Sequence, residues 1–388
     1  MRRVSAHSPK SPVSCFNPFV VFKIAPHTRL HRSPYFEATV ADGVDTFSVY
    51  NHTLMPVGYG DPEAEYWRLI NGVTQWDVAA ERQVQLSGKD AGKLAQILTT
   101  RDLTSCVPEQ GKYVAICNHA GTLINDPILL KLDENRYWLS IADSNILFWA
   151  RAIAAERDLK VEVSEPDVSP LAVQGPKAED VIASVFGEWV RKLKYFWFHK
   201  TETEGIPLMV ARSGWSKQGG FELYLMDGKK GETLWNIVRE AGKPWDIGPG
   251  YPNACERIES GLLSWGGDTD DATNPFEVRM EKYVDLDVPD DVVGIKALRE
   301  ITSRGVARRQ LGAILEGDVV LPSAPVWSEI IDGNGRKIGD LTNRVWSRRL
   351  RKNIGFALVA SDCSPGDAVF VMQDGKQVPA QLSDLPFV

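Results

Sequence analysis

The 388-residue chain has few cysteines and few histidines, and neither type forms a metal-binding pattern. The five cysteines are an odd number without a C-x-x-C pair, so neither a disulfide framework nor a zinc knuckle is predicted. The six histidines show no i, i+4 pair, and H-E-x-x-H, P-loop and G-x-G-x-x-G motifs are all absent. We therefore predict no metal site, and we expect the reducing surroundings of the cytoplasm.

Long apolar runs are also missing. The longest run near the start, Phe16 to Ile24, is interrupted by Asn17, Pro18 and Lys23, which makes it too short to span a bilayer. No A-x-A cleavage pattern follows it. We expect neither a signal peptide nor a membrane-spanning helix.

An excess of positive charge is lacking as well. Lys and Arg number 44 against 51 Asp and Glu, which leaves a net charge of −7. That sign is wrong for a protein that binds by neutralising phosphates, so no nucleic-acid partner is predicted. The composition, 43% hydrophobic and 24% charged, is that of an ordinary folded protein, and the length predicts two or three domains.

The pattern of residues changes along the chain. Residues 1–30 contain scattered prolines and show no sustained period of 2 or 3.6, so we predict a disordered extension there. From Ser33 onward short strands alternate with amphipathic helices, which indicates an α+β fold over residues 31–285.

Two segments of this region resemble each other. Val84 to Ala91 and Leu171 to Ala178 each predict a strand, a glycine turn and the start of a helix, with Gly88 and Gly175 at equivalent places. A third such element begins at Phe221. The repeat suggests two related α+β lobes packed in one unit.

Residues 286–388 have a different character. Short strand-like runs alternate with the hairpin dipeptides Asp332-Gly333, Asn334-Gly335 and Asp374-Gly375, which predicts a small antiparallel β-barrel. A basic run between Arg344 and Lys352 lies in this part; we favour a solvated face over an anion site.

The segment from Val210 to Leu225 carries the clearest chemical signal. In the strand at its end, Glu222 and Tyr224 lie on one face because side chains alternate with period 2. A carboxylate beside a phenol is suited to a flat heterocycle, because the carboxylate accepts two parallel N–H bonds. The alternative is a solvent-facing glutamate on an edge strand.

Trp215 lies in the polar, glycine-rich loop that precedes this strand. An indole on such a loop is suited to face a ligand, and it would stabilise a sulfonium or quaternary ammonium by about 0.5–2 kcal/mol. Lys217 of the same loop is a candidate partner for a carboxylate, and simple solvation is the alternative.

Six motifs follow one another along the chain. They are Ser48-Val-Tyr-Asn-His52, Trp76-Asp-Val78, Gly121-Thr-Leu-Ile-Asn-Asp-Pro127, Ser169-Pro-Leu-Ala-Val-Gln-Gly-Pro176, Ser213-Gly-Trp-Ser-Lys-Gln-Gly-Gly-Phe-Glu-Leu-Tyr224 and Glu256-Arg-Ile-Glu-Ser-Gly-Leu-Leu-Ser264. Taken together and in this order, they resemble the glycine-cleavage T-protein (aminomethyltransferase) superfamily, and within it the dimethylsulfoniopropionate demethylases. The resemblance runs from about Arg29 to Val388.

The resemblance implies a three-lobed fold with tetrahydrofolate in a central channel. It implies that Glu222 holds the pterin and that Tyr224 and Tyr113 line the site. Asp126 matches the catalytic aspartate near the reacting N5. The substrate-binding residues expected with them are Ser213, Trp215 and Lys217.

The activity implied is transfer of a methyl group from dimethylsulfoniopropionate to N5 of tetrahydrofolate, giving methylmercaptopropionate. Such a displacement needs neither a metal nor a strong general acid, because the leaving group departs neutral. Alternative methyl donors are a betaine, a methylated amine or a methoxy-aromatic acid, because Tyr35 to Val44 lacks the basic residue expected for a substrate carboxylate. A non-catalytic folate-binding module and a homodimeric state are also left open.

Overall fold

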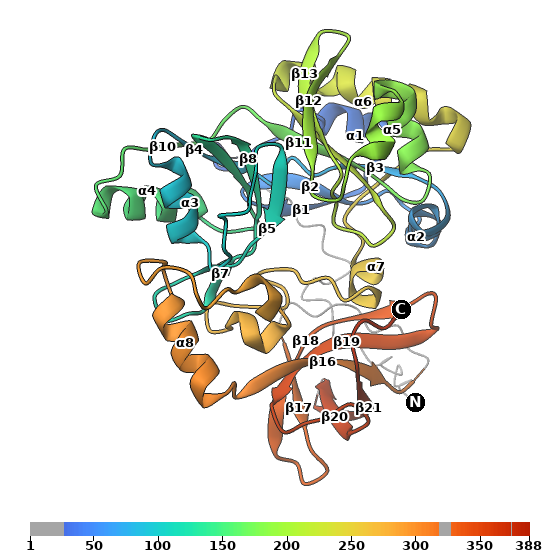
Figure 1. The fold of residues 1–388 in the computed structure, drawn as a ribbon. Coiled ribbons are helices and arrows are strands. Elements are labelled where there is room, and N and C mark those ends of the chain that lie inside the picture. Colours follow the sequence, from blue (N-terminus) through green and yellow to red (C-terminus); the bar gives the residue numbers. More distant parts are fainter. Residues whose placement is uncertain (1–26, 318–326, 374) are drawn as a thin grey trace, which may run out of the picture.

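The computed structural model describes residues 27–317, 327–373 and 375–388 and arranges them in three lobes, two side by side above a third (Figure 1). This arrangement confirms the predicted fold class of two α+β lobes and an antiparallel barrel. Most of the predicted disordered extension, residues 1–26, lies outside the described residues. The boundaries 31–285 and 286–388 stay a prediction.

One lobe is built on a six-stranded sheet that is antiparallel except for its last pair. In spatial order its strands are β12 (Phe198–Thr203), β13 (Ile206–Ala211), β14 (Gly220–Leu225), β11 (Ser169–Gln174), β3 (Thr74–Asp77) and β15 (Gly248–Gly250). Its helices are α1 (Phe36–Ala41), α2 (Pro62–Asn71), α5 (Ala178–Phe186) and α6 (Gly231–Gly242). The core on the helical side combines apolar residues of β11, β13 and β14 with those of α5 and α6.

The neighbouring lobe has a five-stranded antiparallel sheet. In spatial order its strands are β10 (Glu162–Ser164), β4 (Gln83–Ser87), β9 (Arg136–Ser140), β8 (Ile128–Asp133) and β5 (Gln110–Tyr113). Helices α3 (Ala91–Leu98) and α4 (Ile146–Glu156) pack against one face of this sheet. The hairpins β1 (Thr46–Tyr50) with β2 (Thr53–Gly58), and β6 (Ile116–Cys117) with β7 (Leu123–Asn125), lie outside both sheets.

The faces of the two sheets that the helices leave free pack against each other. Their shared core joins Leu130 and Trp138 of one sheet to Met209 and Tyr224 of the other, and the rings of Trp138 and Tyr224 lie 6.4 Å apart. The alternation along β14 places Phe221 and its like-facing neighbours toward the helices. The same alternation places Glu222 and Tyr224 on one face, as the sequence predicts, and the structure directs that face to the interface between the sheets.

The predicted repeat is present in the backbone. Gly88 joins β4 to α3 with φ +130°, and Gly175 joins β11 to α5 with φ +119°. The equivalent turns thus serve equivalent strands, one in each lobe.

The third lobe is a closed antiparallel barrel, as predicted. Its strands follow the order β16 (Arg308–Leu315), β19 (Lys352–Ala360), β18 (Lys337–Ser347), β17 (Ser328–Ile331), β20 (Ala368–Gln373) and β21 (Lys376–Ser383). The dipeptides at Asp332 and Asn334 lie in the turn between β17 and β18. Asp374 itself lies outside the described residues.

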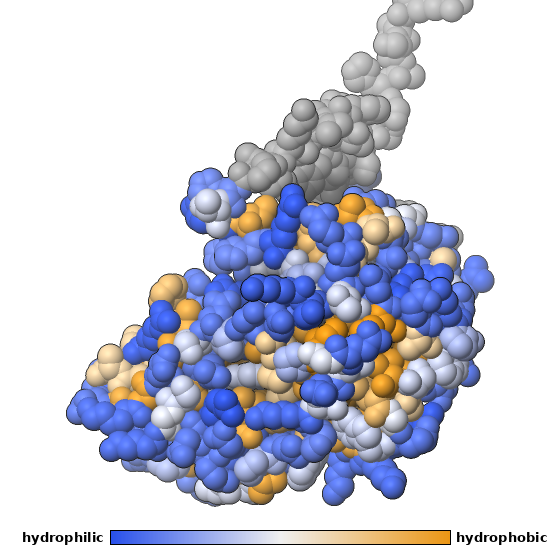
Figure 2. All heavy atoms as spheres, turned by 90° about the horizontal axis from the view of Figure 1, so that it is seen from above, coloured by the Kyte–Doolittle hydropathy of each residue, from blue (hydrophilic) through white to orange (hydrophobic). Residues whose placement is uncertain are grey.

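Two helices connect the α+β lobes to the barrel. Helix α7 (Ala254–Glu259) packs on β18 and β19, and α8 (Ile295–Arg304) packs against β6 and β7 in a mixed core. The face seen in Figure 2 is largely polar, with separate small apolar groups. Within the described ranges no helix is long and apolar enough to cross a membrane.

Candidate active site between the lobes

Glu222 lies inside the protein, at the interface between the two sheets. Strand β14 has neighbours on both sides and Glu222 is 5% exposed, so the alternative of a solvent-facing residue on an edge strand is wrong. Its Oε2 accepts hydrogen bonds from the Ser213 hydroxyl and, at 3.1 Å, from the Tyr224 hydroxyl. Its Oε1 has no donor within the part of the chain that the structure describes. One oxygen of a fixed carboxylate is therefore available to a ligand.

The loop from Ser213 to Gly220 is fixed by the buried side chain of Gln174. The Gln174 amide donates to the Ser213 carbonyl at 3.2 Å and accepts from the Ser216 hydroxyl at 2.8 Å. A Cβ atom at Gly214 would lie 2.0 Å from Gln174 Nε2, and one at Gly220 would lie 2.3 Å from a backbone oxygen of β11. Both glycines also have positive φ, so this close approach requires glycine.

Trp215 and Lys217 lie on the side of this loop that faces α7. The Trp215 indole donates to the Leu263 carbonyl at 3.1 Å, and the guanidinium of Arg257 lies 5.6 Å from the ring centroid. Lys217 has an exposed side chain, and its backbone N–H donates to Glu256 Oε1 at 3.0 Å. The structure thus groups Ser213 with Glu222 and Tyr224, and it places Trp215 and Lys217 in a second group beside α7.

Tyr113 and Asp126 form a pair on the opposite lobe. The Tyr113 hydroxyl at the end of β5 donates a 2.7 Å hydrogen bond to Oδ2 of Asp126, which directly follows β7. The Tyr113 ring meets the ring of Tyr283 edge-on, with 4.8 Å between centroids. Arg101 donates to the Tyr113 carbonyl at 2.9 Å and lies over the Tyr283 ring.

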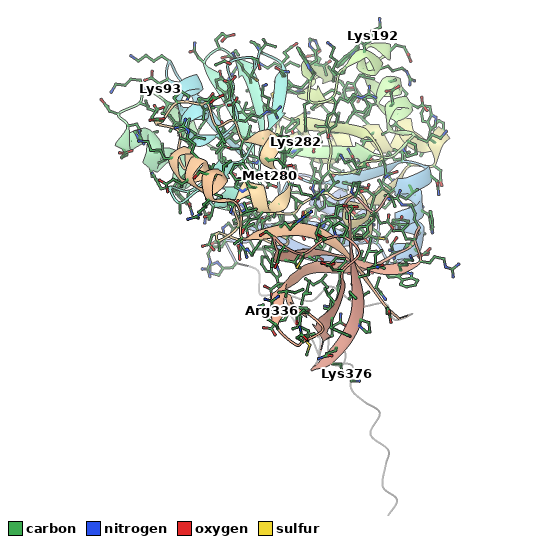
Figure 3. The ribbon with its side chains drawn as sticks, turned by 60° about the horizontal axis from the view of Figure 1, so that its bottom comes forward. Lys93, Lys192, Met280, Lys282, Arg336 and Lys376 are labelled. Atoms are coloured by element: carbon green, nitrogen blue, oxygen red, sulfur yellow. The ribbon has the colours of Figure 1, made fainter. Side chains whose placement is uncertain are left out.

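The segment that carries Tyr283 lies at the centre of the molecule. Figure 3 labels Met280 and Lys282, which lie between the lobes. Met280 belongs to a core that also receives Tyr113 and Tyr283, and the Lys282 ammonium lies 4.9 Å from the Tyr283 ring centroid. This segment therefore brings aromatic and cationic groups to the region where the Tyr113–Asp126 pair is located.

Burial changes the acidity of both carboxylates. It raises the pKa of Asp126 to about 7, even though the hydrogen bond from Tyr113 acts in the lowering direction. It also raises the pKa of Glu222, against the lowering effect of the bonds from Ser213 and Tyr224. Carboxylic acids whose pKa values are shifted in this way are typical of ligand-binding and catalytic sites.

A third acid, Glu81, faces the same region. Burial raises the pKa of Glu81 well above its usual value, and the negative charges of Glu222 and Asp126 raise it further. The charge of Glu81 in turn acts on Tyr224 and on Tyr50. Carboxylates from both lobes thus surround one region, together with several tyrosines.

Two arginines of the basic run, Arg348 and Arg349, join the lobes through ion pairs, so the expectation of a purely solvated face is wrong for these two residues. Arg349 contacts the fully buried Glu259 of α7 at 2.6 Å, and Arg348 contacts Glu63 of α2 at 2.7 Å. Glu259 also accepts a 2.7 Å hydrogen bond from the Tyr66 hydroxyl. These contacts hold the barrel against α2 and α7, neither of which belongs to the barrel.

Comparison with known families accounts for nearly the whole chain. The family described as GCVT N-terminal domain matches residues 35–288, and the glycine cleavage T-protein C-terminal barrel domain matches residues 308–388. The chain belongs to the glycine-cleavage T-protein family. It is therefore a one-carbon transfer enzyme that uses tetrahydrofolate, as the resemblance predicts.

Individual members of the T-protein family show the same relationship. The chain is 40% identical to dimethylsulfoniopropionate demethylase DmdA of Ruegeria pomeroyi over 90% of this chain and 94% of that protein. It is 29% identical to the aminomethyltransferase of Caldanaerobacter subterraneus subsp. tengcongensis over 86% and 89% of the two chains. The crystal structure of the glycine cleavage system aminomethyltransferase T from Bartonella henselae superposes with a TM-score of 0.79 at 21% identity, covering 92% and 98% of the two chains. That superposition confirms the T-protein-like fold.

The residues present fit a folate. The pterin ring of tetrahydrofolate offers an amino group and an N3–H side by side, and these need an acceptor that is held in place. Glu222 provides such an acceptor, because Ser213 and Tyr224 fix Oε2 while Oε1 is left without a protein donor among the described residues. This observation supports the assignment of the folate-binding end of the site to β14.

Sequence reasoning missed Glu81 and Tyr283. Glu81 follows the buried strand β3 and the short apolar run Val78-Ala79-Ala80, but Arg82 and Gln83 come directly after it, so the local sequence gave only a weak signal. Tyr283 gave no comparable signal, because its approach to Tyr113 depends on the path of a long connection between the lobes and the barrel.

Proposed function

We propose that this enzyme moves a methyl group from dimethylsulfoniopropionate to tetrahydrofolate and releases methylmercaptopropionate. The 40% identity to a demethylase of that name over 90% of the chain supports the choice of substrate. The structural observation that carries the proposal is the buried Glu222, fixed at one oxygen and free of protein donors at the other within the described ranges.

Tetrahydrofolate, when bound, supplies the N5 nucleophile that accepts the methyl group. Glu222 binds and orients the pterin through Oε1, and Tyr224 and Tyr113 line the two ends of the site. Asp126 accepts the proton that the reaction releases at N5, since its pKa of about 7 lets the carboxylate take up a proton near neutral pH. The C–S bond electrons leave with the thioether, so no residue has to protonate the leaving group.

The methyl donor is proposed to bind near the glycine-rich loop, with Ser213, Trp215 and Lys217 in contact. Lys217 is the candidate for the substrate carboxylate, because its side chain is exposed and forms no ion pair within the described part of the chain. Arg32, another cation that could meet a substrate carboxylate, lies 3.1 Å from Glu37 and is therefore already paired.

The test is a substrate panel with purified enzyme and tetrahydrofolate. We expect stoichiometric 5-methyltetrahydrofolate and methylmercaptopropionate from dimethylsulfoniopropionate, and little product from a betaine, a methylated amine or a methoxy-aromatic acid. Turnover of one of these alternatives with none of dimethylsulfoniopropionate would assign a different methyl donor to the same site.

Location and assembly follow as further proposals. The four cysteines that the structure describes are free and buried, which supports a reducing, cytoplasmic location. The homodimer stays a prediction, and analytical ultracentrifugation would test it.

A further inference from the structure

We propose that Glu81 is the anionic group that selects a positively charged methyl donor over a neutral one of the same shape. This inference rests on the proposed function and assigns a specificity role to a residue that no motif had indicated. It follows from the position of Glu81, from the absence of a partner for its carboxylate, and from the charges around it.

The backbone next to Glu81 is tied firmly to the rest of the site. The buried amide of Asn51 donates to the carbonyl of Ala80 at 3.0 Å and to that of Ala142 at 3.2 Å. The buried Asn125 bonds both backbone groups of Ala142, at 3.0 and 3.1 Å. Two asparagines thus join four backbone segments, those of Asn51, Ala80, Asn125 and Ala142.

Three of these four segments carry a site residue directly beside the anchored position. Tyr50 precedes Asn51, Glu81 follows Ala80, and Asp126 follows Asn125. Asn51 and its neighbour His52 both have positive φ in the two-residue turn that ends β1, which fixes where Tyr50 leaves the strand. Glu81 is therefore held in a defined position relative to Asp126 and Tyr50.

The carboxylate of Glu81 has no hydrogen-bond or ion-pair partner in residues 27–317, 327–373 and 375–388. The cation next to it in sequence, Arg82, is paired with Glu165 instead. Glu81 is half-buried, so its unpaired carboxylate is open to a ligand that enters the region between the lobes.

Among the described residues, the charges that act on Glu81 are negative. They come from Asp126 after β7 and Glu222 on β14, with the phenols of Tyr50 on β1 and Tyr224 on β14. No three acidic, histidine or cysteine side chains of the described residues lie close enough to hold a metal ion. A bulky organic cation, whose charge is spread over several alkyl groups, fits carboxylates that are spaced in this way.

The burial of three acids predicts how the empty site behaves. Desolvation raises the pKa of Glu81 and of Glu222, and the negative charges of Glu222 and Asp126 raise the pKa of Glu81 further, so these acids hold protons to higher pH than free carboxylic acids do. A cation stabilises the ionised carboxylates, so its binding releases protons, and its affinity rises as pH rises.

Glu81 should affect the binding of the substrate more than the rate of methyl transfer. During transfer the positive charge moves from sulfur to the nitrogen of the acceptor and stays within the same group of carboxylates. Glu81 thus stabilises the bound substrate and the transition state to a similar extent, and uniform binding of this kind lowers KM with little effect on kcat.

The experiment compares dimethylsulfoniopropionate with 4-methylpentanoate, which has the same carboxylate and shape but an uncharged carbon in place of the cationic sulfur. Binding of each to the full-length enzyme is measured by calorimetry, with 5-methyltetrahydrofolate present so that no methyl acceptor is available. The variants are Glu81→Gln, Glu81→Asp and, as a control on the exposed strand β10, Glu162→Gln.

The preference is the ratio of the affinity for dimethylsulfoniopropionate to the affinity for 4-methylpentanoate. We expect Glu81→Gln to lower this ratio about tenfold or more, because a tenfold change corresponds to the loss of one modest charge interaction. Proton release on binding should fall in the same variant, KM should rise with kcat nearly unchanged, and Glu81→Asp and Glu162→Gln should retain the preference.

Two results would contradict the inference, and they differ in what else they affect. If the wild type prefers the sulfonium and Glu81→Gln keeps the same preference and proton release, Glu81 has no such role although the proposed function stands. If the wild type neither binds nor turns over dimethylsulfoniopropionate, the proposed function and the inference are both wrong.

Discussion

The hydroxyl of Tyr113 donates a 2.7 Å hydrogen bond to Oδ2 of Asp126, and this bond opposes the effect of burial on the acidity of Asp126. Burial alone favours the neutral acid, whereas the phenol stabilises the carboxylate. The pair thus holds the pKa of Asp126 at about 7, where a change of pH near neutrality alters its charge.

The first prediction concerns the pH dependence of the reaction. If ionised Asp126 accepts the released proton, kcat should fall as pH drops below about 7. Tyr113→Phe removes a hydrogen bond worth about 1 kcal/mol to the carboxylate, so the acid limb should move up by about 0.7 pH unit. Stopped-time assays from pH 5.5 to 9 measure this shift. Asp126→Asn is the reference and should abolish the limb; an unchanged limb in both variants would assign it to another group.

A second prediction concerns the pterin. Glu222→Gln keeps the size of the side chain but replaces one acceptor oxygen with a donor, so tetrahydrofolate affinity should fall by about 1–3 kcal/mol. Calorimetry with the reduced folate measures the loss, and circular dichroism checks that the variant is folded. Unchanged folate affinity in a folded variant would remove Glu222 from the folate site.

Two substitutions of Trp215 separate the contribution of its aromatic ring from that of its N–H group. Trp215→Phe loses the 3.1 Å bond to the Leu263 carbonyl but keeps an aromatic face, whereas Trp215→Ala loses both. If the ring contacts the substrate cation, Trp215→Ala should weaken sulfonium binding by about 0.5–2 kcal/mol more than folate binding. Equal losses for both ligands would mean that the tryptophan only fixes the loop against α7.

The buried ion pair behind that loop should matter for stability. Arg257 Nη1 lies 2.5 Å from Asp268 Oδ2, and both side chains are almost fully buried. Asp268→Asn leaves the guanidinium without its counter-ion, so the free energy of unfolding should fall by about 3–5 kcal/mol. Urea denaturation measures it, and Asp290→Asn, which breaks the exposed Arg299–Asp290 pair, is the matched control. An equal loss of unfolding free energy in the two variants would show that burying Arg257 adds nothing to the stability that its ion pair provides.

The parts of the fold that depend on local pattern could be predicted from the sequence. The alternation along β14 correctly separates Phe221 from Glu222, and the equivalent glycines, Gly88 and Gly175, mark equivalent turns. Which face of β14 meets another sheet was not predictable, because it depends on packing between segments about a hundred residues apart. For the same reason an edge position for Glu222 was left open until the strand order was known.

The candidate site likewise combines residues that could be predicted from the sequence with residues that could not. Residues inside long motifs, such as Ser213 and Asp126, were found by resemblance, and the structure adds the groups that bond them. Glu81 and Tyr283 depend on long-range placement: the amide of Asn51 fixes the segment of Glu81, and the connection before α8 brings Tyr283 to Tyr113. A single sequence contains no short-range signal for such contacts.

The most direct test of the account is one incubation of the purified enzyme with tetrahydrofolate and dimethylsulfoniopropionate, followed by chromatography of both products. The account predicts 5-methyltetrahydrofolate and methylmercaptopropionate in equal amounts, with Glu222→Gln impaired at subsaturating folate. Absence of both products from a folded enzyme that binds tetrahydrofolate would contradict it.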